Sequence, residues 1–388
     1  MQVVVSTHGA RLVQIAVPDA NGQLVDVALG YDSLDGYLLG QQSMGAIIGR
    51  WAGRLRSGRL SLPEGEPLQL PTNSGPHHHH GGPRGSRFQV FEVGEVHANA
   101  ITLQHVFRTE DDGVPGTVRL VLNIAVSPDN ALSMTWSAEA ADAPTIVNIT
   151  GHAFFNLAGV GSTHGHVLQV PSSRYVPLAA DVCPTGELAS VDGTPFDFRA
   201  PRAVGDSIAA PHEQLERAGG LDHYLVLDDL PQQQPSMRSV NAPWLVDGVR
   251  LAAVLTEPLS GRSMEVWTTA PGVQVYAGHG LKADPARDLG RGTGGAAGCG
   301  SRVMAFAWSR WSSPMPPTIP LSLCGGWPRA TWCMGASCTD FSSRHSCWIG
   351  GGSGGGGFAP KFVSSKFRLS VRAHTAFHCN TTWKGNTP

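Results

Sequence analysis

The chain has 388 residues and a formal net charge of −2, a near balance that excludes a strongly basic surface for nucleic acid or acidic membranes. No run of 18 apolar residues occurs, which excludes a transmembrane helix, and the first residues do not have the pattern of a secretory signal. We therefore expect a cytoplasmic protein that binds neither nucleic acid nor a membrane.

Short apolar segments separated by turn-forming residues follow one another along the first three quarters of the chain. Strands are expected at 11–17, 24–31, 88–93, 100–107, 117–126, 132–140, 166–170, 224–227, 250–255 and 263–269. Turn sequences such as PDANG, EDDGVPG and SPDN lie between them, and amphipathic helices are scarce. Many short strands at regular spacing predict an all-β sandwich or barrel.

The composition changes abruptly after Asp288. Six of the seven cysteines and six of the ten tryptophans lie beyond residue 298, and no Glu follows Glu265. Glycine-rich segments at 286–300 and 350–357 resemble linkers. We expect a β domain over residues 1–285 that is incomplete at its C-terminal side, followed by a poorly ordered tail over 286–388 without strands that complete a sheet.

A change of reading frame explains this break better than a second domain. Tryptophan has the single codon TGG, so the last G of Trp308 followed by AG of a Ser309 codon spells GAG, which encodes Glu. Shifting the stretch AWSRWSSPMPPTIP by one base then permits Leu-Glu-Pro-Met-Val-Phe-Pro-Asp-Ala-Pro-Asn-His-Pro. The hypothesis is that residues 286–388 are the product of a frameshift.

Five motifs carry polar side chains suited to a hydroxyl-rich ligand. They are GAIIGRWAGRLRSGRL, LPTNSGPHHHHGGPRG, TIVNITGHAFFNLAG, GGLDHYLVLD and TTAPGVQVYAGHGL. Arg, Asp and Gln bind hydroxyl groups through hydrogen bonds, some of them charge-assisted. A histidine with an ordinary pKa near 6.5 transfers protons near neutrality, and Phe154, Phe155 and Tyr276 are candidates for apolar contact.

In order and spacing, these motifs resemble the aldose 1-epimerase (galactose mutarotase) family over about residues 8–281. The resemblance implies a large antiparallel β-sandwich that holds the sugar in a cleft on one sheet. It implies an isomerase of carbohydrate metabolism that interconverts the α and β anomers of a free aldose of the glucose or galactose type. No cofactor and no metal is expected, and the expected partner is a small-molecule sugar.

Residue by residue, the resemblance assigns His152 as the general acid that protonates the ring oxygen. It assigns His80, Arg54, Asp222 and Gln274 to substrate binding. The family's general base is a Glu in the C-terminal part, and the chain as written lacks it. The shifted frame at Trp308 supplies such a Glu, followed by Pro-Asp and Asn. Two smaller departures replace the family's Asn by glycine, before His152 and before Arg54.

The assigned chemistry needs an acid and a base on opposite sides of the sugar. Mutarotation removes a proton from the anomeric hydroxyl and adds one to the ring oxygen, so that the ring opens and closes on the other face. Each proton transfer contributes roughly 10²–10⁴-fold to the rate. Without the base Glu, the chain as written is expected to be impaired.

Plainer interpretations stand beside these assignments. His152 alone could be a structural histidine, Asp222 a turn residue and Gln274 a partner of main-chain groups. The tract His77–His80 could be a metal site or a tag remnant, and the arginines other than Arg54 would by default form a solvated edge (Arg50, Arg56, Arg59). The C-terminal cysteines lack the CxxC spacing of a zinc site (Cys324, Cys333, Cys338, Cys347).

Three other functions remain open at this stage. The missing Glu favours a non-catalytic sugar-binding protein on the same fold. A hexose-6-phosphate 1-epimerase would need additional basic residues at the rim of the pocket. A glycoside hydrolase normally uses two carboxylates, whereas only Asp222 is a candidate here.

Overall fold

The computed structural model describes residues 1–19, 22–31, 33–40, 42–62, 66–143, 145–228 and 249–281, and the strands at 290–291, 304–307, 348–349 and 368–373. Side chains are described as far as residue 281. The rest of the predicted tail, including its cysteines, lies outside the described residues, so the boundary at 285 stays a prediction.

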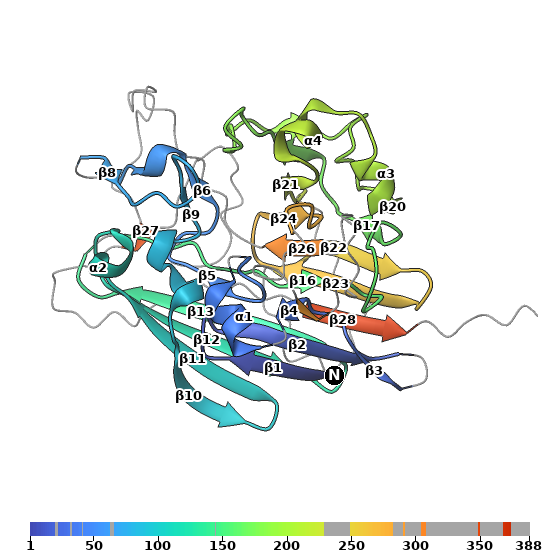
Figure 1. The fold of residues 1–388 in the computed structure, drawn as a ribbon, viewed down its shortest axis with the longest axis horizontal. Coiled ribbons are helices and arrows are strands. Elements are labelled where there is room, and N and C mark those ends of the chain that lie inside the picture. The colour runs from blue at the N-terminus through green and yellow to red at the C-terminus, as the bar shows by residue number, and fades with distance from the viewer. Residues whose placement is uncertain are drawn as a thin grey trace, which may run out of the picture.

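A nine-stranded sheet in which all neighbouring strands are antiparallel forms the larger layer (Figure 1). In spatial order its strands are β10 (Glu92–His97), β11 (Ala100–Phe107), β12 (Val118–Val126), β13 (Ala131–Ala140), β28 (Arg368–Ala373), β23 (Arg262–Thr268), β22 (Arg250–Glu257), β17 (Val167–Gln169) and β20 (Arg202–Ala203).

A six-stranded antiparallel sheet forms the second layer, and a three-stranded sheet adjoins them. In spatial order the second layer contains β16 (Phe154–Phe155), β26 (Met304–Ala307), β24 (Gly272–Tyr276), β21 (Asp222–Val226), β18 (Arg174–Val176) and β19 (Ala189–Ser190). The three-stranded sheet contains β1 (Gln2–Ser6), β2 (Arg11–Pro18) and β3 (Leu24–Asp26).

Five two-stranded ribbons and a few short helices complete the described structure. The ribbons pair β5 (Ile47–Ile48) with β15 (Thr150–Gly151), β6 (Arg54–Leu55) with β9 (His78–His79), β7 (Arg59–Leu60) with β8 (Leu68–Gln69), β4 (Gly30–Tyr31) with β25 (Gly290–Arg291), and β14 (Thr145–Ile146) with β27 (Trp348–Ile349). The α-helices are α1 (Leu34–Leu39), α2 (Thr109–Asp112), α3 (Val204–Ile208) and α4 (Glu213–Ala218), and the 3₁₀ turns are η1 (Arg56–Gly58), η2 (Gly82–Arg84) and η3 (Ser86–Phe88). None of the helices in the described part of the chain is long and apolar enough to span a membrane.

Alternation along the strands places one apolar core between the sheets. On β12, Val118, Leu120 and Leu122 are at most 1% exposed, whereas residues between them face outward. The same core cluster contains Leu225 of β21 and Val275 of β24 from the six-stranded sheet. The two sheets therefore pack face to face, and the predicted antiparallel β-sandwich is confirmed.

Two strands from the predicted tail lie inside the sandwich sheets. Strand β26 pairs with β16 and β24, and β28 pairs with β13 and β23. The expectation that no strand after residue 286 completes a sheet is therefore wrong for these segments. Strand pairing uses main-chain groups, so it does not depend on the acidic residues whose scarcity marks the tail. Apolar and polar residues also alternate in RLSVRA of β28, a pattern that the change in composition obscured.

Arg50 is buried and not part of a solvated edge. Its side chain is fully inaccessible, and Nη1 lies 3.4 Å from Oδ1 of Asp112. The guanidinium also donates to main-chain oxygens of Val114 and Pro115. Arg56 and Arg59 are exposed as expected. Arg50 thus links the loop after α2 to the segment between β5 and β6.

Candidate active site

The first half of the site is the ribbon of β6 and β9, in which Arg54 lies opposite His79. His80 follows directly, and its main-chain N–H donates to the carbonyl of Gly53 at 3.1 Å. The N–H of Gly53 donates in return to Nδ1 of His80, also at 3.1 Å. Because Nδ1 accepts a proton donor, neutral His80 carries its own proton on Nε2, which leaves that nitrogen as the donor toward a ligand.

Gly81 allows the chain to turn immediately after His80. Its φ is +76°, in the left-handed region that favours glycine. A Cβ at this position would lie 2.2 Å from the carbonyl oxygen of Gly49. The backbone therefore requires glycine at position 81, directly after His80.

His152 comes from the neighbouring ribbon of β5 and β15. Its N–H donates to the carbonyl of Ala46 at 2.9 Å, and its carbonyl accepts from Gly45 at 3.1 Å. The rings of His80 and His152 meet edge to face, with centroids 5.2 Å apart. Nδ1 of His152 is buried and forms no hydrogen bond with any other described residue. The two histidines assigned from the sequence thus lie in contact.

The pKa of His152 differs from the ordinary histidine value near 6.5. Burial lowers its pKa to about 4, with a hydrogen bond to its own main chain acting the other way and the charges of Arg87 and Arg11 lowering it further. Burial and the surrounding positive groups likewise hold the pKa of His80 well below the usual range. Near neutrality, His152 of the unliganded site is therefore neutral.

The second half of the site lies on the paired strands β21 and β24. Nε2 of Gln274 donates to Oδ1 of Asp222 at 2.7 Å. Asp222 lies opposite Tyr276 in the register, and Tyr224 lies opposite Gln274, so these four side chains share one face of the sheet. The opposite face presents residues such as Val275 to the core. The sheet therefore turns a polar face toward the site.

Aromatic contacts join the two halves. The ring of His152 lies 5.0 Å from that of Phe154, and Phe154 lies 6.0 Å from Tyr276, measured between centroids. Tyr276 is the register partner of Asp222. The structure therefore brings His80, His152, Arg54, Asp222 and Gln274 to one region. Phe155 is the exception among the expected aromatic residues. It belongs to the main core, whereas Phe154 belongs to a separate cluster against which Tyr276 packs.

Arg87 is a site residue that the sequence analysis missed. It is 7% exposed, Nη1 donates to the hydroxyl of Ser43 at 3.1 Å, and the buried Nε has no partner within the described part of the chain. Its charge acts on His79, His80 and His152 and lowers the pKa of each. The only sequence signal was its place in HHHHGGPRGSRF, a few residues after the histidine tract.

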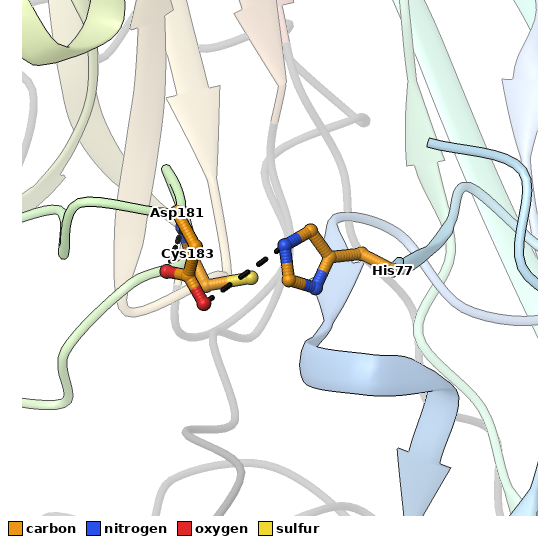
Figure 2. Close-up of side chains that lie close together, drawn as sticks. All are labelled: His77, Asp181 and Cys183. Carbon is orange, nitrogen blue, oxygen red and sulfur yellow. Dashed lines mark hydrogen bonds and ion pairs between the residues drawn. The ribbon is translucent and has the colours of Figure 1, made fainter. Parts of the chain in front are cut away.

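Beside this site, one group of side chains among the described residues has the composition of a metal site: His77, Asp181 and Cys183 (Figure 2). Their ligand atoms lie within 4.8 Å of one another, and Figure 2 shows His77 approaching the other two from the opposite side. Nδ1 of His77 accepts the N–H of Ser57 at 3.1 Å, so neutral His77 carries its proton on Nε2, 3.9 Å from Oδ2 of Asp181.

A metal does not fit that arrangement. A ligating histidine needs an unprotonated nitrogen, and a ligating cysteine needs to be a thiolate. Nδ1 of His77 is occupied as the acceptor from Ser57, so the nitrogen that faces Asp181 and Cys183 carries the proton and is not free to bind a metal. Burial and the charge of Asp181 also raise the pKa of the Cys183 thiol. The group instead connects the histidine tract to the turn containing Asp181, which also pairs with Arg56 at 3.3 Å.

Comparison with known proteins gives one consistent result. The family model described as aldose 1-epimerase matches residues 1–313, which extends beyond the predicted boundary at 285. Galactose mutarotase of Homo sapiens is 32% identical over 281 residues, covering 72% of this chain and 75% of that protein. Aldose 1-epimerase of Escherichia coli K12 is 29% identical over 288 residues, covering 74% and 78%.

Solved structures show the same fold at lower sequence identity. An aldose epimerase homologue from C. elegans superimposes with a TM-score of 0.71 at 21% identity over 96% of both chains. Galactose 1-epimerase from Lactobacillus acidophilus NCFM gives a TM-score of 0.69 at 21% identity over 96% of this chain and 91% of that one. The fold is the antiparallel β-sandwich of these aldose epimerase structures. The chain belongs to the aldose 1-epimerase family, a family of isomerases.

Proposed function

We propose that the protein acts as an aldose 1-epimerase on a free aldose of the glucose or galactose type. The observation that carries the proposal is the contact of His80 with His152, linked through Phe154 and Tyr276 to the hydrogen-bonded pair of Gln274 and Asp222. A proton-transferring pair thus lies next to a carboxylate and an amide that suit sugar hydroxyls.

In this proposal His152 gives a proton to the ring oxygen and takes it back on closure. His80, whose Nε2 carries the available proton, donates a hydrogen bond near the same oxygen. Asp222 and Gln274 hold hydroxyl groups, and Arg54 adds a charged donor whose buried Nε has no partner in the described segments. Ring opening moves the anomeric proton to a base, and closure on the other face gives the other anomer.

The base is the weak point of the chain as written. Among the described residues, Asp222 is the carboxylate of the site, and its bond to Gln274 suits hydroxyl binding. No Glu follows Glu265, and the reading-frame hypothesis would restore one at Trp308. We therefore expect slow mutarotation from this polypeptide, with water as the base.

The lowered pKa of His152 adds a second reason for slow turnover. A neutral imidazole is a poor acid, and the surrounding arginines hold His152 in that form. A neutral His152 adds to the effect of the missing base, so both proton transfers are expected to be slow in the chain as written.

A non-catalytic sugar-binding protein is the second candidate. Its support is the same missing base, because the groups proposed to hold hydroxyls are present in the chain as written. The two candidates share a ligand and differ in turnover.

Polarimetry with freshly dissolved α-galactose and α-glucose, beside calorimetry with the same sugars, distinguishes the candidates. An epimerase speeds the change in rotation above the buffer rate, and His152→Gln abolishes the increase. Binding with no increase in rate supports the binding protein. If neither binding nor turnover occurs in the chain as written or in the frame-corrected protein, the proposed function is wrong.

A further inference from the structure

Four arginines of the described chain are buried: Arg11, Arg50, Arg87 and Arg262. They differ in the groups that accept hydrogen bonds from their guanidinium. Arg50 faces the carboxylate of Asp112. Arg11 donates to the main-chain oxygens of Met44 and Arg87, and Arg262 donates to that of Leu157. Arg87 alone among them donates to neither a carboxylate nor a carbonyl, since its one acceptor is the hydroxyl of Ser43.

A buried guanidinium in this state is costly. Removing a charge from water is unfavourable unless a partner compensates it. Burial lowers the pKa of Arg87 to about 10, and Arg11 adds to the shift, so the group stays charged near neutrality. Its guanidinium carbon lies 4.5 Å from the centroid of the Phe88 ring, a cation–π contact that offsets part of the cost, but its Nε–H has no acceptor among the described residues. Arg87 therefore keeps a buried donor that suits an anion.

The position of Arg87 ties it to the proposed reaction centre. Ser43, which accepts from Arg87, lies two residues before Gly45, whose N–H donates to the carbonyl of His152. The charge of Arg87 acts on His79, His80 and His152 together. Arg54, from the ribbon that carries His79, also has a buried Nε without a partner among the described residues. Two buried N–H donors from arginines therefore lie in the region of the histidines.

We propose that Arg87 forms an anion subsite beside His152 that takes the carboxylate or phosphate group of an acidic aldose, such as a uronate or an aldose phosphate. This inference rests on the proposed function for the sugar itself. Arg87 supplies charge-assisted hydrogen bonds that a neutral aldose does not use. The bound anion also compensates the positive groups around His152, so an acidic ligand promotes protonation of that histidine.

The test measures dissociation constants by calorimetry for inorganic phosphate, galactose, galacturonate and galactose 6-phosphate. Arg87→Met is the main variant, Arg87→Lys keeps the charge, and Arg84→Met removes an exposed arginine paired with Asp111 as a matched control. Hydrogen bonds to charged groups are strong enough that Arg87→Met should weaken binding of the anions by at least about tenfold. The galactose constant should stay within about threefold, and Arg84→Met should change neither.

The two acidic sugars distinguish the sources of the anion. If Arg87→Met weakens binding of galacturonate and galactose 6-phosphate equally, the subsite takes both carboxylate and phosphate groups. If it weakens binding of only one of these sugars, the subsite takes the acidic group of that sugar. In the wild-type protein, phosphate should raise the pKa of His152, followed by its ring resonances in NMR. That readout stands even if Arg87→Met does not fold.

The proposal is overturned if Arg87→Met leaves the phosphate and galacturonate constants unchanged, or if it weakens galactose equally. It is also overturned if phosphate leaves the His152 resonances unmoved. Its failure is separate from that of the proposed function. Absence of mutarotation with anion binding that depends on Arg87 would remove the epimerase and keep the subsite, whereas mutarotation without any effect of Arg87 on anions would do the reverse.

Discussion

Gln274 and Asp222 form a diagonal pair across two neighbouring strands, with Nε2 of Gln274 2.7 Å from Oδ1 of Asp222. The bond orients the carboxylate of Asp222, which lies opposite Tyr276 in the strand register. Because each side chain fixes the other, the pair is expected to bind sugar as one unit.

Gln274→Ala should weaken sugar binding even though the carboxylate remains. Each of Gln274→Ala and Asp222→Ala should raise the dissociation constant by about tenfold or more, because hydrogen bonds to charged groups contribute about 1.5–3 kcal/mol. The double variant should lose less than the sum of the two, as contacting residues are non-additive. Calorimetry with galactose measures all three, and additive losses would show that the two residues act independently.

His152→Gln should lower the mutarotation rate by roughly 10²-fold in a protein that contains the base Glu, while the Michaelis constant changes less. The reason is that glutamine keeps a hydrogen-bonding group but transfers no proton. Polarimetry gives both constants, and His97→Gln, at an exposed histidine, is the control. Near-normal turnover of His152→Gln would exclude His152 as the acid.

A gene with one base corrected upstream of Trp308 should encode a faster enzyme. Restoring an acid–base partner contributes about 10²–10⁴-fold. Assaying both polypeptides side by side checks this, after sequencing of the gene across codons 285–310. A chain as written that is already fast would mean that another group serves as base.

Acid should destabilise the fold in a window set by buried histidines. Burial lowers the pKa of His166 to about 4, partly offset by Glu257, and burial with nearby histidines lowers that of His223 to about 3. Both favour the neutral form when folded, so their stabilisation is complete above pH 6.5 and is lost as pH falls toward 4. Nε2 of His166 accepts the N–H of Leu157 at 3.0 Å, a bond that protonation breaks.

Urea unfolding between pH 7.5 and pH 4 measures that loss. The unfolding free energy should change by about 1.4 kcal/mol per pH unit for each histidine that takes up a proton on unfolding. His166→Gln should lower stability at pH 7.5 and flatten the slope by one proton. An unfolding free energy that is flat down to pH 4 would contradict the burial argument.

Asp112→Ala should be among the more damaging single substitutions. It leaves the buried guanidinium of Arg50 without its carboxylate, a change that typically costs 3–5 kcal/mol. Arg84→Ala, which removes an exposed ion pair, should cost less than about 1 kcal/mol. Thermal unfolding of both variants makes the comparison, and similar losses would show that the main-chain oxygens alone satisfy Arg50.

Periodicity predicted the long strands of the sandwich and some short ones, such as β17 and β21, and missed others. The expected strand at 100–107 coincides with β11, and those at 117–126 and 132–140 differ from β12 and β13 by one residue. The strand expected at 88–93 lies instead at Glu92–His97, because 3₁₀ turns occupy the residues before it. Strand β24 is five residues long, and its identity depends on pairing with β21.

Motif resemblance predicted which polar residues gather, but not the electrostatics of their surroundings. His80, His152, Arg54, Asp222 and Gln274 could be named because their local sequences are distinctive. The low pKa of His152 and the unpaired charge of Arg87 arise from burial and from arginines distant in sequence. Spacing along the chain contains no information about either.

Strand β28 lies in the middle of the nine-stranded sheet, hydrogen-bonded to β13 on one side and β23 on the other (Figure 1). The chain is synthesised from its N-terminus, so β13 and β23 exist long before the strand that joins them. During that interval both expose unpaired edges, which are templates for association with other chains. The far end of the gene therefore controls when this sheet can close during translation, and growing chains should depend on chaperones until residue 373 emerges.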